Sequence, residues 1–99
     1  MLYAIISQDI ENSLSLRMQT RPDHVDRLEA LKRQGRLILA GPHPNIDNDD
    51  PGEAGFSGSL VVAEFNSLSD AEEWANTDPY KTAGVYASVT VKPFKLVLP

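Results

Sequence analysis

Three short apolar runs set the strongest constraint on how this chain of 99 residues can fold. They are Leu2–Ile6, Leu37–Ala40 and Leu60–Ala63, and in each run the odd and the even positions are apolar. Successive side chains of a strand point to opposite faces, so these runs predict strands that are buried on both faces. They are too short for helices, and no apolar run reaches the length needed to cross a membrane.

Two segments with helical patterns lie between the predicted strands. In the first, Thr20 is the predicted N-cap, apolar residues recur at helical spacing, and Gly35 is the predicted stop. A longer helix that begins near Ser13 is the alternative. In the second, Ser69–Glu72 reads as a capping box, and Asp78–Tyr80 ends the helix because the residue before a proline avoids helical geometry.

The last predicted strand alternates in polarity, and Pro93 is expected to end its pairing. The alternation predicts one face with Val85, Ala87, Val89 and Val91, and an opposite face with Tyr86, Ser88 and Thr90. The element order is then strand–helix–strand–strand–helix–strand. Right-handed connections favour the ferredoxin-like βαββαβ split of the α+β class, with a four-stranded antiparallel sheet and two helices on one face. A chain of this length predicts a single domain, residues 1–99.

The predicted layers leave one face of the sheet uncovered. Two helices can cover only one side of four strands, yet the three apolar runs have apolar side chains on both sides. A second copy of the chain is the simplest cover for the remaining face. The sequence therefore predicts a homodimer in which the two sheets face each other.

Composition excludes several classes of function. The formal net charge of −5 disfavours binding to nucleic acid and to anionic membrane surfaces. The chain has no cysteine, so a disulfide framework, a thiolate nucleophile and a cysteine zinc site are excluded. The first residues lack a basic region and a cleavage site, so we expect a cytoplasmic protein rather than a secreted one.

His24 is the first candidate for chemistry. Six of the nine lysines and arginines fall between Arg17 and Arg36, which predicts either a solvated helix face or a site attractive to a small anion. If the helix begins at Thr20, its dipole would favour a neutral imidazole at His24, able to accept a proton. Arg21 is a candidate clamp for a substrate carboxylate or phenolate.

A long connection follows the second strand, which Gly41–Pro42 is predicted to end. The connection His43–Ser57 is expected to be functional or mobile. Its segment Asp47–Gly52 is similar to the start of a calcium loop, but the glutamate required at the twelfth position is a glycine. No histidine spacing supports another metal, so neither a metal nor a cofactor is expected.

Four stretches carry a family resemblance over nearly the whole chain. They are LYAIISQD, RPDHVDRLEALKRQGRLILAGP, DNDDPGEAGFSGSLVVAEF and DPYKTAGVYASVTVKPFK. Together they resemble the YciI-like (YCII-related) family. The resemblance implies a dimeric α+β barrel similar to muconolactone isomerase and to a dehydrochlorinase of chlorinated hydroxyquinols. It also implies a histidine–aspartate site, carried over to His24 and Asp78.

The residues leave the partner of His24 and the kind of function open. Asp9 and Asp23 are alternatives to Asp78, which lies beyond the far end of the second helix. Further candidates to contact a substrate are Arg21, Gly41, Pro42 and Tyr80. Three hypotheses follow: a cofactor-free isomerase or lyase acting on a small anionic or aromatic molecule, a non-catalytic module that binds a small ligand, and a structural partner protein.

Overall fold

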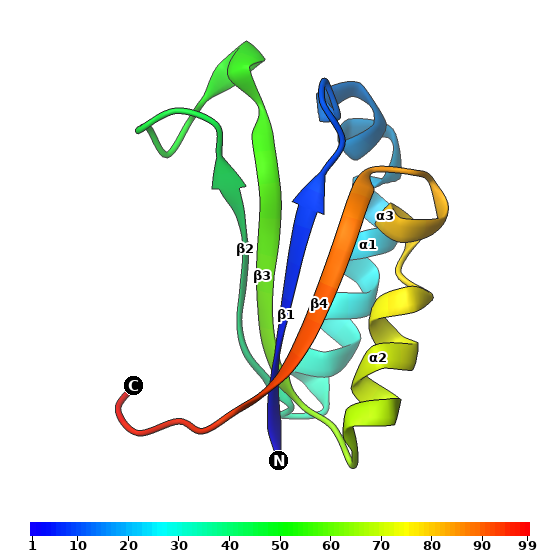
Figure 1. The fold of residues 1–99 in the computed structure, drawn as a ribbon, viewed down its shortest axis with the longest axis vertical. Helices are drawn as coiled ribbons and strands as arrows, with labels where there is room; N and C mark the ends of the chain where they lie inside the picture. Colours follow the sequence, from blue (N-terminus) through cyan, green and yellow to red (C-terminus); the bar gives the residue numbers. More distant parts are fainter.

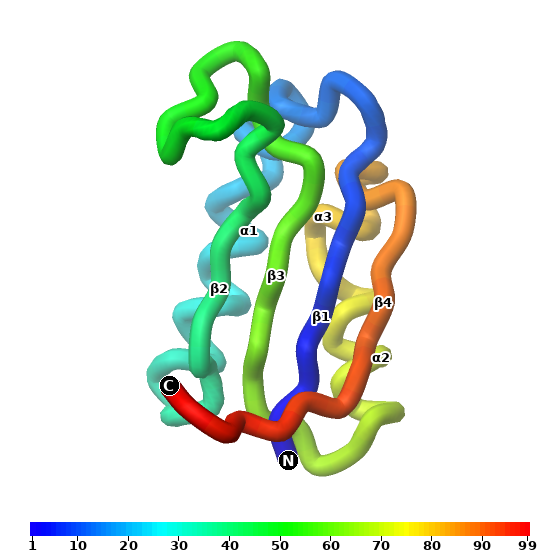
Figure 2. The backbone as a smooth tube through the Cα atoms, turned by 60° about the vertical axis from the view of Figure 1, so that its left-hand side comes forward, coloured from blue at the N-terminus to red at the C-terminus, as the bar shows by residue number.

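The protein is a four-stranded antiparallel sheet with all its helices on one face (Figure 1); the structure, a computed structural model, describes residues 1–99. The elements in chain order are β1 Leu2–Asp9, α1 Leu14–Arg33, β2 Leu37–Pro44, a 3₁₀ turn Gly52–Ala54, β3 Phe56–Glu64, α2 Leu68–Asn76, α3 Pro79–Thr82 and β4 Tyr86–Phe94. The strand order is β2-β3-β1-β4, which Figure 2 shows from the open side. The predicted ferredoxin-like fold is confirmed.

Helix α1 is longer than its predicted N-cap at Thr20 allows. It begins at Leu14, so the alternative start near Ser13 is correct and Pro22 lies inside the helix. Proline at this position lacks the N–H that would bond to the carbonyl of Met18, and its ring crowds that same carbonyl. At the other end Gly35 has a φ of +71°, and Gly35 and Arg36 donate to the carbonyls of Lys32 and Leu31 in a Schellman motif. The predicted stop is therefore confirmed.

The second helical segment is capped two residues earlier than predicted and is divided in two. The hydroxyl of Ser67, rather than Ser69, accepts the N–H of Asp70 at the start of α2. The Asp-Pro-Tyr sequence ends α2 as expected and also starts α3. There the Asp78 carboxylate accepts the N–H of Tyr80 at 2.9 Å, which fixes the carboxylate at the junction of the two helices.

Two predicted strand ends are wrong, and both involve proline. Strand β2 continues through Gly41–Pro42 to Pro44, and Pro93 in β4 pairs with Tyr3 of β1. Both β2 and β4 are edge strands, where a residue without an N–H interrupts no inner ladder. A register shift opposite Gln8 and Asp9 also turns Tyr86 to the helix side, where its hydroxyl meets that of Ser59, so its predicted face is wrong.

The core lies between the sheet and the helices. It consists of buried side chains from β1, β3 and the residue that follows β3, α1 and α2: Tyr3, Ile5, Leu31, Val61, Ala63, Phe65, Ala71 and Ala75. None of the helices is long and apolar enough to cross a membrane.

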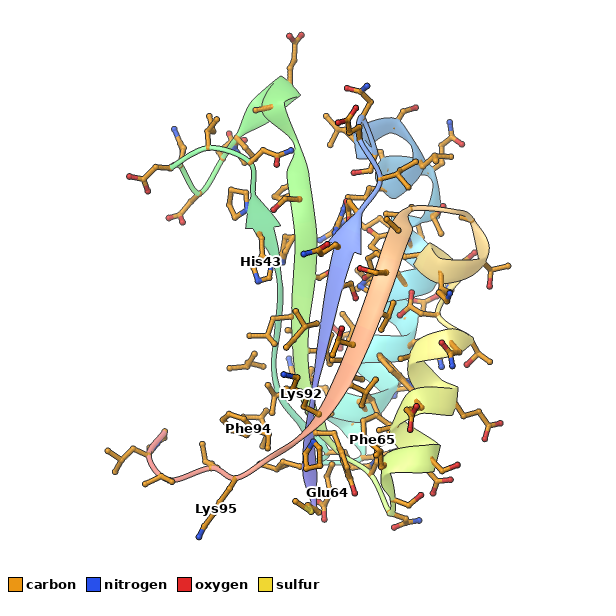
Figure 3. All side chains as sticks on the ribbon, viewed as in Figure 1. His43, Glu64, Phe65, Lys92, Phe94 and Lys95 are labelled. Atoms are coloured by element: carbon orange, nitrogen blue, oxygen red, sulfur yellow. The ribbon has the colours of Figure 1, made fainter.

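No helix covers the opposite face of the sheet. Ile6, Leu39 and Phe94 there are 37%, 47% and 38% exposed. Figure 3 shows His43 and Phe94 projecting on this side, whereas Phe65 projects toward the helices. The tail after β4 leaves on the same side (Figure 1), and its residues Val97 and Leu98 are 77% and 80% exposed. This open face carries the apolar surface from which the sequence predicts a dimer.

Candidate active site

A cavity of about 280 Å³ lies between α1, the strands β2 and β3, and the start of α3. Eight of its 14 lining residues are hydrophobic. The polar side chains in the lining are Arg17, Arg21, His24, Ser59 and Tyr80. A largely apolar cavity with a few converging polar groups is the usual form of a small-molecule site.

His24 and Asp78 meet at one end of this cavity. The ring Nδ1 of His24 lies 2.8 Å and 3.0 Å from the two carboxylate oxygens of Asp78, and both residues are buried. A carboxylate can only accept, so Nδ1 carries the hydrogen when Asp78 is ionised. Nε2 has no hydrogen-bond partner in the protein. Every fully buried polar side-chain atom does have one, so Nε2 is not fully buried, and His24 lines the cavity.

Tyr80 fixes the plane of the imidazole. The two rings stack with centroids 4.0 Å apart and planes 11° from parallel. The guanidinium of Arg17 also lies over the Tyr80 ring, at 5.0 Å, and the Tyr80 hydroxyl donates to the Arg17 carbonyl. Burial raises the pKa of Tyr80 above its ordinary value, although Arg17 and Arg21 oppose this, so the phenol stays neutral. The His24 ring is therefore held by its stacking partner as well as by Asp78.

Arg17 and Asp9 form a buried ion pair in the cavity wall. Arg17 Nε and Nη2 donate to the two Asp9 oxygens at 2.5 Å and 3.0 Å, and Nη2 also donates to the Gly58 carbonyl. Ser13 donates its hydroxyl to Asp9 instead of capping α1. Burial alone would lower the pKa of Arg17, but the hydrogen bond and the charge of Asp9 raise it. Arg17 therefore stays protonated, and Asp9 balances its charge.

These contacts show which of the predicted site residues lie together. Arg21, Gly41, Pro42 and Tyr80 all line the cavity beside His24. Of the alternative partners for His24, Asp9 is bound to Arg17 and Asp23 is exposed, so His24 pairs with Asp78 alone. Asp78 follows the end of α2 and would lie far from a histidine at the start of α1, but the longer α1 places His24 in mid-helix, within reach of Asp78.

The predicted effect of the helix dipole on His24 is wrong. The dipole acts within the first turn, and His24 lies more than two turns after the start of α1 at Leu14. The groups that contact the ring are instead the side chains of Asp78 and Tyr80. His43 lies on the open face of the sheet, and no group of three or more potential metal-ligating side chains is present in residues 1–99.

Three residues around the site were not singled out from the sequence: Arg17, Arg27 and Phe56. Arg17 belongs to the noted basic stretch and lies seven residues before His24, which is two turns of helix and therefore the same face. That spacing becomes informative only once the helix is known to begin at Leu14. Phe56 has no comparable signal, because it comes from the end of the long connection.

The buried phenol of Tyr86 should make the folded protein less stable at alkaline pH. Burial raises its pKa to about 12 from an ordinary 10.0, although the Ser59 hydrogen bond opposes the shift. Above pH 10 the unfolded chain loses this proton while the folded protein keeps it, so stability falls as the pH rises toward 12. We expect Tyr86 to account for a loss of about 2 kcal/mol in unfolding free energy over that range. Urea titrations at several alkaline pH values measure it, and Tyr86→Phe should have a shallower dependence; equal slopes would contradict the prediction.

Taken together, the fold and the cavity define a class: ferredoxin-like α+β proteins with a histidine–aspartate pair in an apolar cavity beneath the helix layer. The model of the YCII-related domain matches residues 1–95, and the chain belongs to this family. Protein YciI of Escherichia coli O6:H1 is 56% identical over 97 residues, which are 98% of this chain and 99% of that protein. An uncharacterized protein of Haemophilus influenzae is 53% identical over the same length.

A solved structure is similar over nearly the whole chain. It is the 5-chloro-2-hydroxyhydroquinone dehydrochlorinase of Burkholderia phenoliruptrix, in a complex with 2,5-dihydroxybenzoquinone. The TM-score is 0.84 at 26% sequence identity, over 96% of this chain and 94% of that one. The architecture of this chain therefore also occurs in a protein that is a dehydrochlorinase.

Proposed function

We propose that this protein is a cofactor-free enzyme that transfers a proton on a small anionic or aromatic molecule, in an isomerase- or lyase-like reaction. One observation carries the proposal. Asp78 occupies Nδ1 of His24 at 2.8 Å, and Nε2 of the same ring is left free beside an apolar cavity. A histidine oriented by a carboxylate, with its second nitrogen free, is the usual arrangement of a general base.

His24, Asp78, Arg21 and the apolar walls then have distinct roles. His24 Nε2 takes a proton from the substrate and returns it to the product or to a leaving group, while Asp78 stabilises the imidazolium that forms. Arg21, which has no carboxylate partner within 4.0 Å, binds a carboxylate or phenolate of the substrate near the cavity mouth. The apolar walls bind a planar ring of the substrate. The similar dehydrochlorinase likewise binds a planar ring compound, 2,5-dihydroxybenzoquinone.

The same cavity supports a second candidate function, a non-catalytic module that binds a small ligand. A binding module needs the apolar walls and Arg21 but has no use for a free Nε2. Binding without turnover, unaffected by conservative changes at His24, would favour this alternative.

The test is a screen of small phenols, quinols and carboxylic acids for thermal stabilisation, followed by assays of turnover with the compounds that bind. A compound present at 100 times its Kd should raise the free energy of unfolding by about 2.7 kcal/mol. For a compound that turns over, we expect His24→Asn to lower kcat by about 10²- to 10⁴-fold while the fold is kept. The matched control is Asp23→Asn, an exposed change one residue away, which should leave kcat unchanged. Unimpaired turnover by His24→Asn would reject the role of His24.

We also propose that two copies associate through their open sheet faces. The supporting observation is the exposed apolar surface of Ile6, Leu39 and Phe94. Sedimentation at micromolar concentration should give twice the chain mass of 10.9 kDa. Ile6→Asp should shift the protein to the monomer, whereas Leu68→Asp, at a residue of similar exposure on the helix side (40% against 37%), should not. A monomeric parent protein would contradict the proposal.

A further inference from the structure

Arg27 contacts the Asp78 side of the site without reaching the cavity. It lies three residues after His24 on α1, so both side chains project toward the junction of α2 and α3. Its Nη1 lies 3.7 Å from Asp78 Oδ2. The same guanidinium donates to the Trp74 carbonyl at 3.0 Å and to the Thr77 hydroxyl at 3.1 Å, and it lies 4.4 Å from the centre of the Trp74 ring.

The Asp78 carboxylate needs positive charge nearby because it is only 3% exposed. Its Oδ1 accepts the Tyr80 N–H, and both of its oxygens face His24 Nδ1. If His24 were its only ionisable partner, the buried anion would be balanced only by a protonated imidazole. A protonated imidazole cannot accept a proton. Arg27 offers a permanent cation at the same carboxylate, which removes that requirement.

We propose that Arg27 is a positioning residue that keeps the His24–Asp78 pair in its proton-accepting form, with a neutral imidazole over an ionised carboxylate. The inference rests on the proposed function, since it concerns the same pair, and it assigns to Arg27 the effect that the helix dipole cannot exert on a histidine in mid-helix. Burial lowers the pKa of Arg27 and Asp78 opposes that change, so the guanidinium stays charged and electrostatically coupled to the carboxylate.

The other charged and titratable groups around the pair do not substitute for Arg27. Arg17 is neutralised by Asp9 and lies on the far side of the site, over Tyr80. Arg21 is exposed to solvent, and the raised pKa values keep the phenols of Tyr80 and Tyr86 neutral. Strands β2 and β3 contribute no ionisable side chain to the cavity lining. Arg27 is therefore the cation whose removal should most change the charge state of the ring.

The test reads the ring itself, by ¹⁵N NMR of histidine-labelled protein near neutral pH. In the parent protein the two His24 nitrogens should show the widely separated shifts of a neutral ring with hydrogen on Nδ1. In Arg27→Gln the two shifts should converge toward the values of an imidazolium, and in Arg27→Lys, which keeps the charge, they should return toward the parent pattern. Unchanged shifts in Arg27→Gln, or equal convergence in both variants, would overturn the proposal.

Two more variants separate this effect from a structural one. Thr77→Val removes one anchor of the Arg27 guanidinium but no charge, so it should lower the melting temperature without moving the His24 shifts. Should Arg27→Gln not fold, Arg27→Met keeps an unbranched stem against the Trp74 ring and also lacks the charge. The readout needs no substrate, so a failure here leaves the proposed reaction standing, and an inactive parent protein leaves this inference testable.

Discussion

Gly58→Ala is expected to prevent the protein from folding, with a loss of about 4 kcal/mol or more in unfolding free energy. A Cβ at Gly58 would lie 2.0 Å from the carbonyl oxygen of Ser7 and 3.3 Å from the Cα of Gln8. Both atoms belong to the backbone of β1, a central strand that is paired on both sides and cannot move away. Urea or thermal denaturation followed by circular dichroism measures the loss.

Gly41→Ala is the matched control for this change. Gly41 lies on the neighbouring strand β2, and a Cβ there meets no atom within 4 Å. We expect its unfolding free energy to stay within about 0.5 kcal/mol of the parent value. The close approach of β3 to β1 also presents the Gly58 carbonyl to Arg17 at 3.0 Å, so the steric demand at Gly58 helps to shape the cavity wall. A Gly58→Ala protein with parental stability would show that the strands can separate there.

Asp9→Ala should cost about 3–5 kcal/mol, because it leaves the buried guanidinium of Arg17 without its counter-charge. The Arg17 residue is only 6% exposed, and Asp9 accepts from Nε and Nη2 of Arg17 and from the Ser13 hydroxyl. The free energy of unfolding in urea measures the cost. Glu11→Ala, an exposed acid two residues along the chain, should change it by less than about 0.5 kcal/mol.

A double variant identifies the cause of that loss. In Asp9→Ala with Arg17→Leu neither charge of this buried ion pair remains, so part of the stability should return. The two changes should therefore be markedly less than additive. Additive losses, or a loss below about 1 kcal/mol in Asp9→Ala alone, would contradict an ion pair on which the cavity wall depends.

Sequence patterns were most informative where the interaction is local. The Gly35 stop depends on a left-handed conformation and two backbone bonds within one turn, and it was predictable. The start of α1 was not, because Thr20 and Pro22 form a good N-terminal signal that the packing of a longer helix overrides. The predicted face of Tyr86 in β4 was wrong for a related reason. A register shift against β1 depends on the partner strand, and the alternation within one strand does not show it.

Periodicity and turn chemistry act over a few residues, so they were enough to predict the βαββαβ order, the strands that are apolar on both faces, and His24 as a candidate. The tertiary structure alone decided which groups meet. His24 and Asp78 are 54 residues apart, and Asp9, a possible partner for His24, is instead bound by Arg17. A buried charge takes the partner that the packed helices and strands bring within hydrogen-bond reach, and that proximity exists only once distant elements have packed together.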